Sequence, residues 1–126
     1  MTVSKRILII DDEPDVGFTL KLVLENQGFI VDCYTNPAMA SMDFRGDLYD
    51  LVILDIKMPE INGFELYNQF KLKDTKIETL FLTALNSLTA YDEHRSRVYP
   101  KMGERHFVRK PINNNELLEQ IYSIIS

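Results

Sequence analysis

The chain has 126 residues, of which 45% are hydrophobic and 26% are charged, and its net charge is −5 at pH 7; this size suits one globular domain over residues 1–126 and is small for two. The negative charge argues against nucleic-acid binding, which needs a basic face, and no apolar run approaches the roughly 18 residues of a membrane-spanning helix. The single Cys33 excludes an internal disulfide and favours a reducing, cytoplasmic location.

The first half of the chain alternates short apolar runs with segments in which apolar residues recur every three or four positions. The runs indicate strands, and the spaced segments indicate helices. Pro14 suits the first turn of a helix and Gly28 its end. The elements expected here are a strand at 7–10, a helix from Pro14 to Gly28, a strand at 30–34, and a helix from Asn36-Pro37 to about Arg45.

The second half continues the alternation. Gly63 is expected to provide a tight turn before a helix, and Asn113 to Asn115 are expected to cap the last helix. The elements expected here are a strand at 51–55, a helix containing 64–70, a strand at 79–83, a polar helix between Ser87 and Val98, a strand at 106–108, and a last helix with an apolar stripe at Leu117, Ile121, Ile124 and Ile125.

Five strands alternating with five helices predict an α/β domain, with a five-stranded parallel sheet and helices on both faces. The run before Asp55 is aliphatic throughout, as in strands buried on both faces. Open α/β sheets bind ligands at the carboxyl ends of their strands. The chemically active residues at those ends are Asp11-Asp12-Glu13, Asp55, Thr83-Ala84 and Lys110-Pro111.

These residue types predict a phosphate-handling site. Clustered carboxylates repel one another, and a hard cation such as Mg²⁺, for which Mn²⁺ can substitute, relieves the repulsion. Asp12 and Asp55 are the expected direct ligands, with Asp11 in support. Asp55 can act as a nucleophile on phosphorus, because carboxylates form acyl phosphates. The groups that can compensate the phosphoryl charge are the Lys110 ammonium, the Thr83 hydroxyl and the Ala84 amide.

Each signal also has a plainer interpretation. The acids at 11–13 could cap the following helix, Lys110 could be a solvated loop residue, and Phe107 could simply belong to the core. The alignment of the acids with Asp55, Thr83 and Lys110 favours a site. His94 and His106 are expected to be surface residues, since Mg²⁺ prefers oxygen ligands.

The chain resembles the CheY-like receiver domain of two-component response regulators, essentially from Ile7 to Ile125. The resemblance implies a flavodoxin-like strand order, 2-1-3-4-5, within a single domain. The motifs that carry it are Asp11-Asp12-Glu13, Leu54-Asp55 with Met58-Pro59 and Gly63, Thr83-Ala84, and Lys110-Pro111. Each motif is weak alone, but in this order they are specific.

The resemblance implies a role for each matching position. Asp55 would be the phosphoacceptor, and Asp11 with Asp12 would hold Mg²⁺ with help from the backbone carbonyl of Lys57. Such a domain is no conventional enzyme, although it catalyses much of its own phosphorylation and dephosphorylation. The residues that would bind the phosphoryl oxygens are Thr83 and Lys110, and those that would switch are Thr83 and Phe107.

The resemblance also implies partners. The phosphoryl group would come from a sensor histidine kinase or a phosphotransfer protein. It would change the surface around the fourth helix, fifth strand and fifth helix, and so control a downstream protein, an output domain or a phosphorylation-dependent homodimer. Both a stand-alone regulator and a fragment of a longer one fit the chain. The Lys110–Pro111 peptide is usually cis in this family.

Two features depart from the family pattern. The interval from Thr83 to Lys110 is several residues longer than usual, and Pro100 to Gly103 replaces the small pair that commonly precedes the fifth strand. In the family that this chain resembles, the positions held here by Lys57 and Leu85 flank the phosphoryl group and govern attack by water. A large Leu85 would obstruct water and Lys57 could pair with the phosphoryl oxygens, which together predict slow self-dephosphorylation.

Two other classes of protein compete with this interpretation. A Mg²⁺-dependent phosphatase of the haloacid-dehalogenase type also uses an Asp nucleophile, but it needs a second acid where this chain has Lys57. A receiver-like binding module that acts without phosphate would not need the complete set of acids, Thr83 and Lys110. Uptake of a phosphoryl group distinguishes the binding module from a working receiver.

Overall fold

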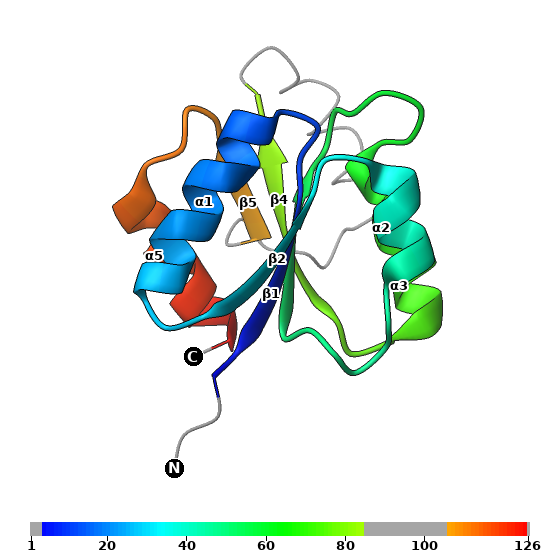
Figure 1. Ribbon diagram of the computed structural model, residues 1–126, viewed down its shortest axis with the longest axis horizontal. Coiled ribbons are helices and arrows are strands. Elements are labelled where there is room, and N and C mark those ends of the chain that lie inside the picture. The colour runs from blue at the N-terminus through cyan, green and yellow to red at the C-terminus, as the bar shows by residue number, and fades with distance from the viewer. Residues whose placement is uncertain (1–3, 85–105, 126) are drawn as a thin grey trace.

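The computed structural model describes residues 4–84 and 106–125, which form five strands and four helices (Figure 1). The polar helix expected between Ser87 and Val98 lies outside the described residues. The elements are β1 (Arg6–Ile10), α1 (Pro14–Asn26), β2 (Ile30–Tyr34), α2 (Pro37–Asp43), β3 (Leu51–Asp55), α3 (Gly63–Lys73), β4 (Glu78–Thr83), β5 (Phe107–Arg109) and α5 (Asn114–Ile125).

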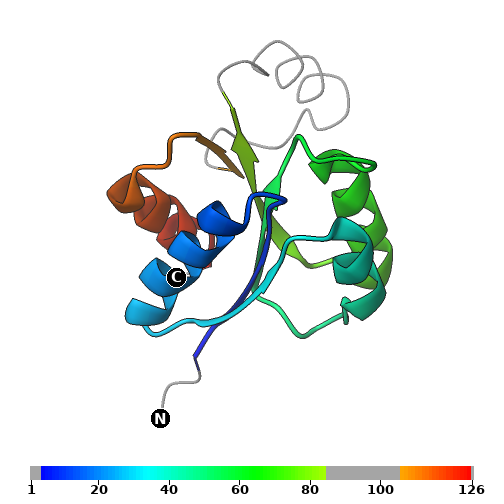
Figure 2. The same cartoon turned by 45° about the horizontal axis from the view of Figure 1, so that its top comes forward.

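The strands form one parallel sheet in the order β2-β1-β3-β4-β5, which confirms the predicted α/β fold and the flavodoxin-like strand order. Because every neighbouring pair is parallel, the chain leaves all the strands at the same edge. The connections that follow β1, β3 and β5 accordingly lie together at one end of the sheet (Figure 2). The sheet therefore brings together residues that are far apart in the sequence.

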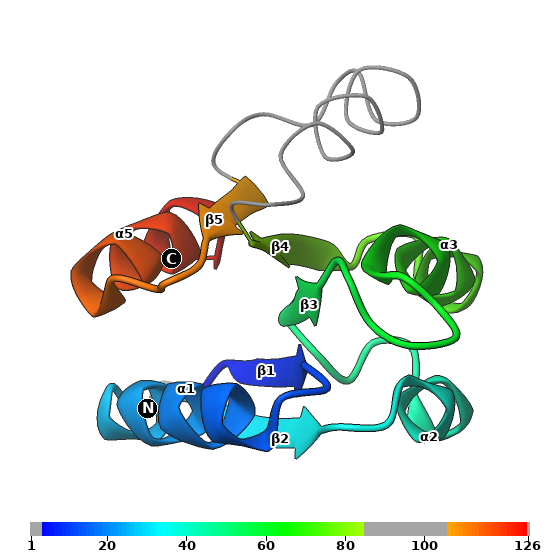
Figure 3. The same cartoon turned by 90° about the horizontal axis from the view of Figure 1, so that it is seen from above.

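Helices cover both faces of the sheet, with α1 and α5 on one face and α2 and α3 on the other (Figure 3). Alternate residues of β3 enter the two cores: Ile53 packs on the side of α1 and α5, and Leu54 on the side of α2 and α3. All five β3 residues are buried. Burial on both faces of the sheet explains why this strand is an unbroken aliphatic run up to Asp55.

Side chains define both ends of α2. Asn36 caps α2, because its Oδ1 accepts hydrogen bonds from the backbone N–H groups of Ala38 (2.9 Å) and Met39 (3.2 Å). The same helix was expected to reach Arg45, but it ends at Asp43. Phe44 adopts an extended backbone, which buries its ring in a stack on Phe70 with the ring centroids 4.1 Å apart.

Candidate functional site

Two buried carboxylates form the centre of the site. Asp11 directly follows β1 and Asp55 is the last residue of β3, and these strands are neighbours. Asp11 is 0% exposed and Asp55 5% exposed. The Asp11 backbone N–H donates to the carbonyl of Tyr34 (3.1 Å), while Asp11 Oδ1 accepts from the N–H of Glu13 (2.9 Å). The backbone thus fixes one carboxylate beside the other.

Four acidic side chains meet at this point. Asp11, Asp12, Glu13 and Asp55 each place one carboxylate oxygen within 4.8 Å of the others. A set of oxygen donors at this spacing, partly buried and partly open to water, fits the preference of Mg²⁺ for carboxylates and retained water molecules. The donor set therefore suits the metal that the sequence predicted.

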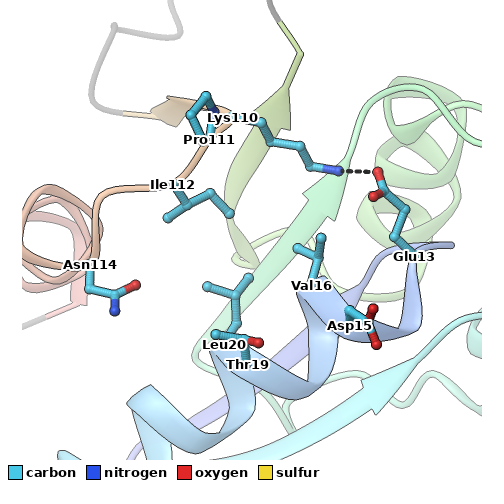
Figure 4. Close-up of a pocket in the computed structure, with 9 residues that line it drawn as sticks. All are labelled: Glu13, Asp15, Val16, Thr19, Leu20, Lys110, Pro111, Ile112 and Asn114. Atoms are coloured by element: carbon cyan, nitrogen blue, oxygen red, sulfur yellow. Dashed lines mark hydrogen bonds and ion pairs between the residues drawn. The ribbon is translucent and has the colours of Figure 1, made fainter.

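Lys110 enters the acidic cluster from the other end of the chain. Its Nζ lies 3.0 Å from Asp11 Oδ2, 3.2 Å from Glu13 Oε1 and 3.4 Å from Asp55 Oδ2. Its backbone N–H donates to the carbonyl of Thr83 (2.7 Å), and the Lys110–Pro111 peptide is cis. Figure 4 shows the side chain reaching towards Glu13. One ammonium group thus pairs with three carboxylates.

The electrostatics follow from burial and crowding. Burial, followed by the negative charge of Asp11, raises the pKa of Asp55 to about 7, although Lys110 opposes this shift. Burial also raises the pKa of Asp11. For Lys110, burial favours the neutral form, but the hydrogen bond and charge of Asp11 outweigh it, so that its pKa is raised. A proton or a bound cation would relieve this excess of negative charge.

The other residues predicted for the site take different positions around it. Thr83, at the end of β4, is 1% exposed, and its hydroxyl contacts the carbonyl of Ala84 at 3.4 Å. Lys57 is exposed just beyond β3. Phe107 is buried and stacks on Phe81 with the ring centroids 5.3 Å apart. Thr83 therefore lies at the same edge as Asp55, whereas Phe107 belongs to the core beneath it.

A cavity of about 560 Å³ adjoins the acidic cluster. It lies between the start of α1 and the loop that precedes α5 (Figure 4). Val16, Leu20 and Ile112 provide apolar walls, while Glu13 and Lys110 border it on the side of the cluster. The site thus combines a charged centre with an apolar approach.

Comparison with known proteins identifies the family. The sequence model of the protein family described as the response regulator receiver domain matches residues 7–122. The chain belongs to this family. As a receiver domain of two-component response regulators, it is not an enzyme of the conventional kind. None of the helices described by the structure is both long and apolar enough to cross a membrane.

Solved receiver domains share the fold. The non-phosphorylated HemR receiver domain from Leptospira biflexa is 30% identical, with a TM-score of 0.82, over 98% of this chain and 95% of that one. The TrrA response regulator from Thermotoga maritima, solved in complex with Mg²⁺ and a beryllium fluoride, is 33% identical, with a TM-score of 0.73, over 95% and 98%.

Curated relatives are longer than this receiver domain. The response regulator SaeR from Staphylococcus aureus is 29% identical over 120 residues, which are 95% of this chain and 50% of SaeR. The chain therefore spans about half the length of the curated relatives that it matches. The family assignment applies to the receiver domain, and the outputs of those longer proteins are not carried over.

The structure also corrects one expectation about a histidine and adds one residue to the site. His106, expected at the surface, is 9% exposed and its Nδ1 lies 2.8 Å from the carbonyl oxygen of Thr79; His94 lies outside the described residues. Glu13 occupies the cap position of α1 but makes no side-chain cap hydrogen bond, so capping does not account for its carboxylate. The run Asp11-Asp12-Glu13 indicated that Glu13 lies near the site, but it did not indicate that Glu13 pairs with Lys110.

Proposed function

We propose that this receiver domain accepts a phosphoryl group on Asp55 from a sensor histidine kinase or a phosphotransfer protein. The observation that supports the proposal best is the pairing of the buried Asp55 carboxylate with Lys110 beside a second buried carboxylate, that of Asp11. This arrangement offers a nucleophile, a cation-binding group and a phosphate-binding ammonium at one point.

The chemistry is a transfer between two oxygens or from nitrogen to oxygen. An Asp55 carboxylate oxygen attacks phosphorus while the bond between phosphorus and the donor's leaving atom breaks. The electron pair of that bond stays on the leaving atom. The Lys110 ammonium, the Thr83 hydroxyl and the Ala84 amide would bind the phosphoryl oxygens. These groups position and neutralise charge, which is most of what phosphoryl transfer requires of a protein.

The acidic cluster would hold Mg²⁺, and Mn²⁺ would serve in its place. Asp11, Asp12 and Asp55 would supply carboxylate oxygens, and the backbone carbonyl of Lys57 would complete the protein ligands. A bound cation would neutralise charge on the phosphoryl oxygens and on the crowded carboxylates. In the TrrA complex named above, a receiver relative is bound to Mg²⁺ and a beryllium fluoride, which supports this assignment.

The phosphoryl group would act as a switch through Thr83 and Phe107. Thr83 would move towards the phosphoryl oxygens, and the packing of Phe107 would change the surface around β5, α5 and the helix expected between Ser87 and Val98. A downstream protein, an output domain or a second copy of the chain would recognise that surface. The cavity that borders Glu13 and Lys110 would receive an apolar part of the donor protein beside the site. We place this exchange in the cytoplasm.

Intact mass measurement tests the proposal. The protein is incubated with acetyl phosphate, with and without Mg²⁺, and weighed beside Asp55→Asn. Asp47→Asn is the matched control, because Asp47 is exposed and precedes β3, at the opposite edge of the sheet. We expect the wild type and the control to gain one phosphoryl group only with Mg²⁺, and Asp55→Asn to gain none.

A histidine kinase or phosphotransfer protein provides the second arm of the test. A folded wild type that gains no phosphoryl group from acetyl phosphate or from such a protein would contradict the proposal and favour a phosphate-independent binding module. A gain that persists in Asp55→Asn would place the acceptor elsewhere.

A further inference from the structure

The three carboxylates that pair with Lys110 differ in their exposure to water. The side chain of Asp11 is 0% exposed and that of Asp55 is 7% exposed, whereas that of Glu13 is 63% exposed. The distances from Lys110 Nζ differ little, at 3.0, 3.4 and 3.2 Å in that order. Lys110 therefore has two interior partners and one partner at the rim of the site.

The interior partners are the ones that a divalent cation would need. Under the proposed function, on which this inference rests, Asp11 and Asp55 both contribute oxygens to Mg²⁺. An ammonium group beside a divalent cation is repelled by it. The Lys110 backbone is held by its hydrogen bond to Thr83, so only the side chain can withdraw. Cation binding must therefore weaken two of the three ion pairs of Lys110.

Glu13 is placed to keep the third pair. Its backbone is fixed at the start of α1, because its N–H donates to Asp11 Oδ1 and its carbonyl accepts from the N–H groups of Val16 and Gly17. Its side chain makes no cap hydrogen bond. The carboxylate instead meets Lys110 across the space between α1 and the loop that precedes α5 (Figure 4).

We propose that Glu13 is a positioning residue, an outer anchor that holds the Lys110 ammonium at the rim while a divalent cation occupies Asp11 and Asp55. The Glu13–Lys110 pair strengthens as the interior pairs are lost, and so it favours the cation-bound state. It also keeps the ammonium close to the place where a phosphoryl group would arrive. Glu13 acts through Lys110 and needs no direct bond to the cation.

A double-mutant cycle on Mg²⁺ affinity tests this role without any phosphoryl transfer. Calorimetric titration with MgCl₂ is performed on the wild type, Glu13→Gln, Lys110→Met and the double variant. Gln keeps the size of Glu13 and removes its charge, and Met keeps much of the Lys110 stem. We expect Glu13→Gln to weaken Mg²⁺ binding about five-fold in the wild-type background, the upper range for a partly exposed ion pair, and much less in Lys110→Met.

Asp15→Asn is the matched control, because Asp15 is an exposed acid in the first turn of the same helix. It should leave Mg²⁺ affinity nearly unchanged. Equal weakening by Glu13→Gln in both Lys110 backgrounds would mean that Glu13 acts on the cation directly, and no weakening in either would mean that it does not position Lys110. Either result overturns the proposal for Glu13 alone, whereas a folded wild type that binds no Mg²⁺ would overturn the proposed metal site as well.

Discussion

Gly63 packs against Asp55 so closely that a methyl group at Gly63 would lie 2.6 Å from the Asp55 carbonyl oxygen and 3.0 Å from the Cα of Ile56. The Gly63 N–H also donates to the carbonyl of Ile56 at 2.8 Å. The start of α3 is thus docked on the backbone that carries the proposed phosphoacceptor. This close approach explains the glycine, which was expected to serve a tight turn; the left-handed backbone in the preceding loop occurs at Glu60, with φ 71°.

Replacing Gly63 by Ala should therefore lower stability and disturb the site together. The new methyl group meets backbone atoms, which cannot rotate away, and overpacking of this kind typically costs about 1–3 kcal/mol. Urea unfolding should show that loss, and Mg²⁺ affinity should fall because Asp55 is displaced. Unchanged stability would contradict the close docking of α3 on Asp55.

Lys110→Met should destabilise the protein in the absence of divalent cations. Lys110 compensates Asp11 and Asp55, and removing one partner of a buried ion pair typically costs about 3–5 kcal/mol. Partial protonation of the acids should reduce that cost, since their pKa values are already raised. Thermal unfolding with and without Mg²⁺ measures the effect. We expect saturating Mg²⁺ to recover much of the loss, because the cation then replaces the ammonium as counter-charge.

The raised pKa of Asp55 predicts the direction of a pH effect. Its ordinary value is 3.8 and its value in the folded protein is about 7, so between these the folded state binds more protons than the unfolded state. The contribution of Asp55 to the free energy of unfolding should be most favourable below about pH 4 and should be lost as pH rises towards 7. Above pH 7 it should change no further.

Asp55→Asn isolates this contribution from the other titrating groups. Without divalent cations the variant should be more stable than the wild type at pH 8, and the difference should shrink as pH falls towards 4. Saturating Mg²⁺ should narrow or reverse the difference at pH 8, because the wild type binds the cation more tightly. A stability difference that is independent of pH would show that Asp55 ionises normally.

Much of the fold could be predicted from the sequence because the central strands β1 and β3 consist mostly of continuous apolar runs. A parallel sheet covered on both faces buries such runs completely, and this geometry brings the residues after them to one edge. Asp11, Asp55, Thr83 and Lys110 could accordingly be predicted as neighbours before any contact was known. Helix ends were less predictable, as α2 shows, because the burial of Phe44 against Phe70 depends on tertiary packing.

The contacts within the site could not be predicted in the same way. The sequence places Glu13 beside two other acids, but its pairing with Lys110 depends on where the loop after β5 directs that side chain. The burial of His106 could not be predicted for the same reason, because it depends on a contact with the carbonyl of Thr79 on the neighbouring strand. Spacing along the chain indicates which residues share an edge, whereas ion pairs depend on distances across it.

Slow loss of the phosphoryl group remains a prediction for this receiver domain. Lys57 is exposed two residues after Asp55, and we expect its ammonium to pair with phosphoryl oxygens; Leu85, which lies outside the described residues, is large and apolar. Both properties oppose the approach of water to phosphorus. Intact mass measured over time after removal of the donor should give a half-life of minutes or longer, and Lys57→Ala and Leu85→Ala should each shorten it. A wild-type half-life of seconds would show that neither residue protects the phosphoryl group.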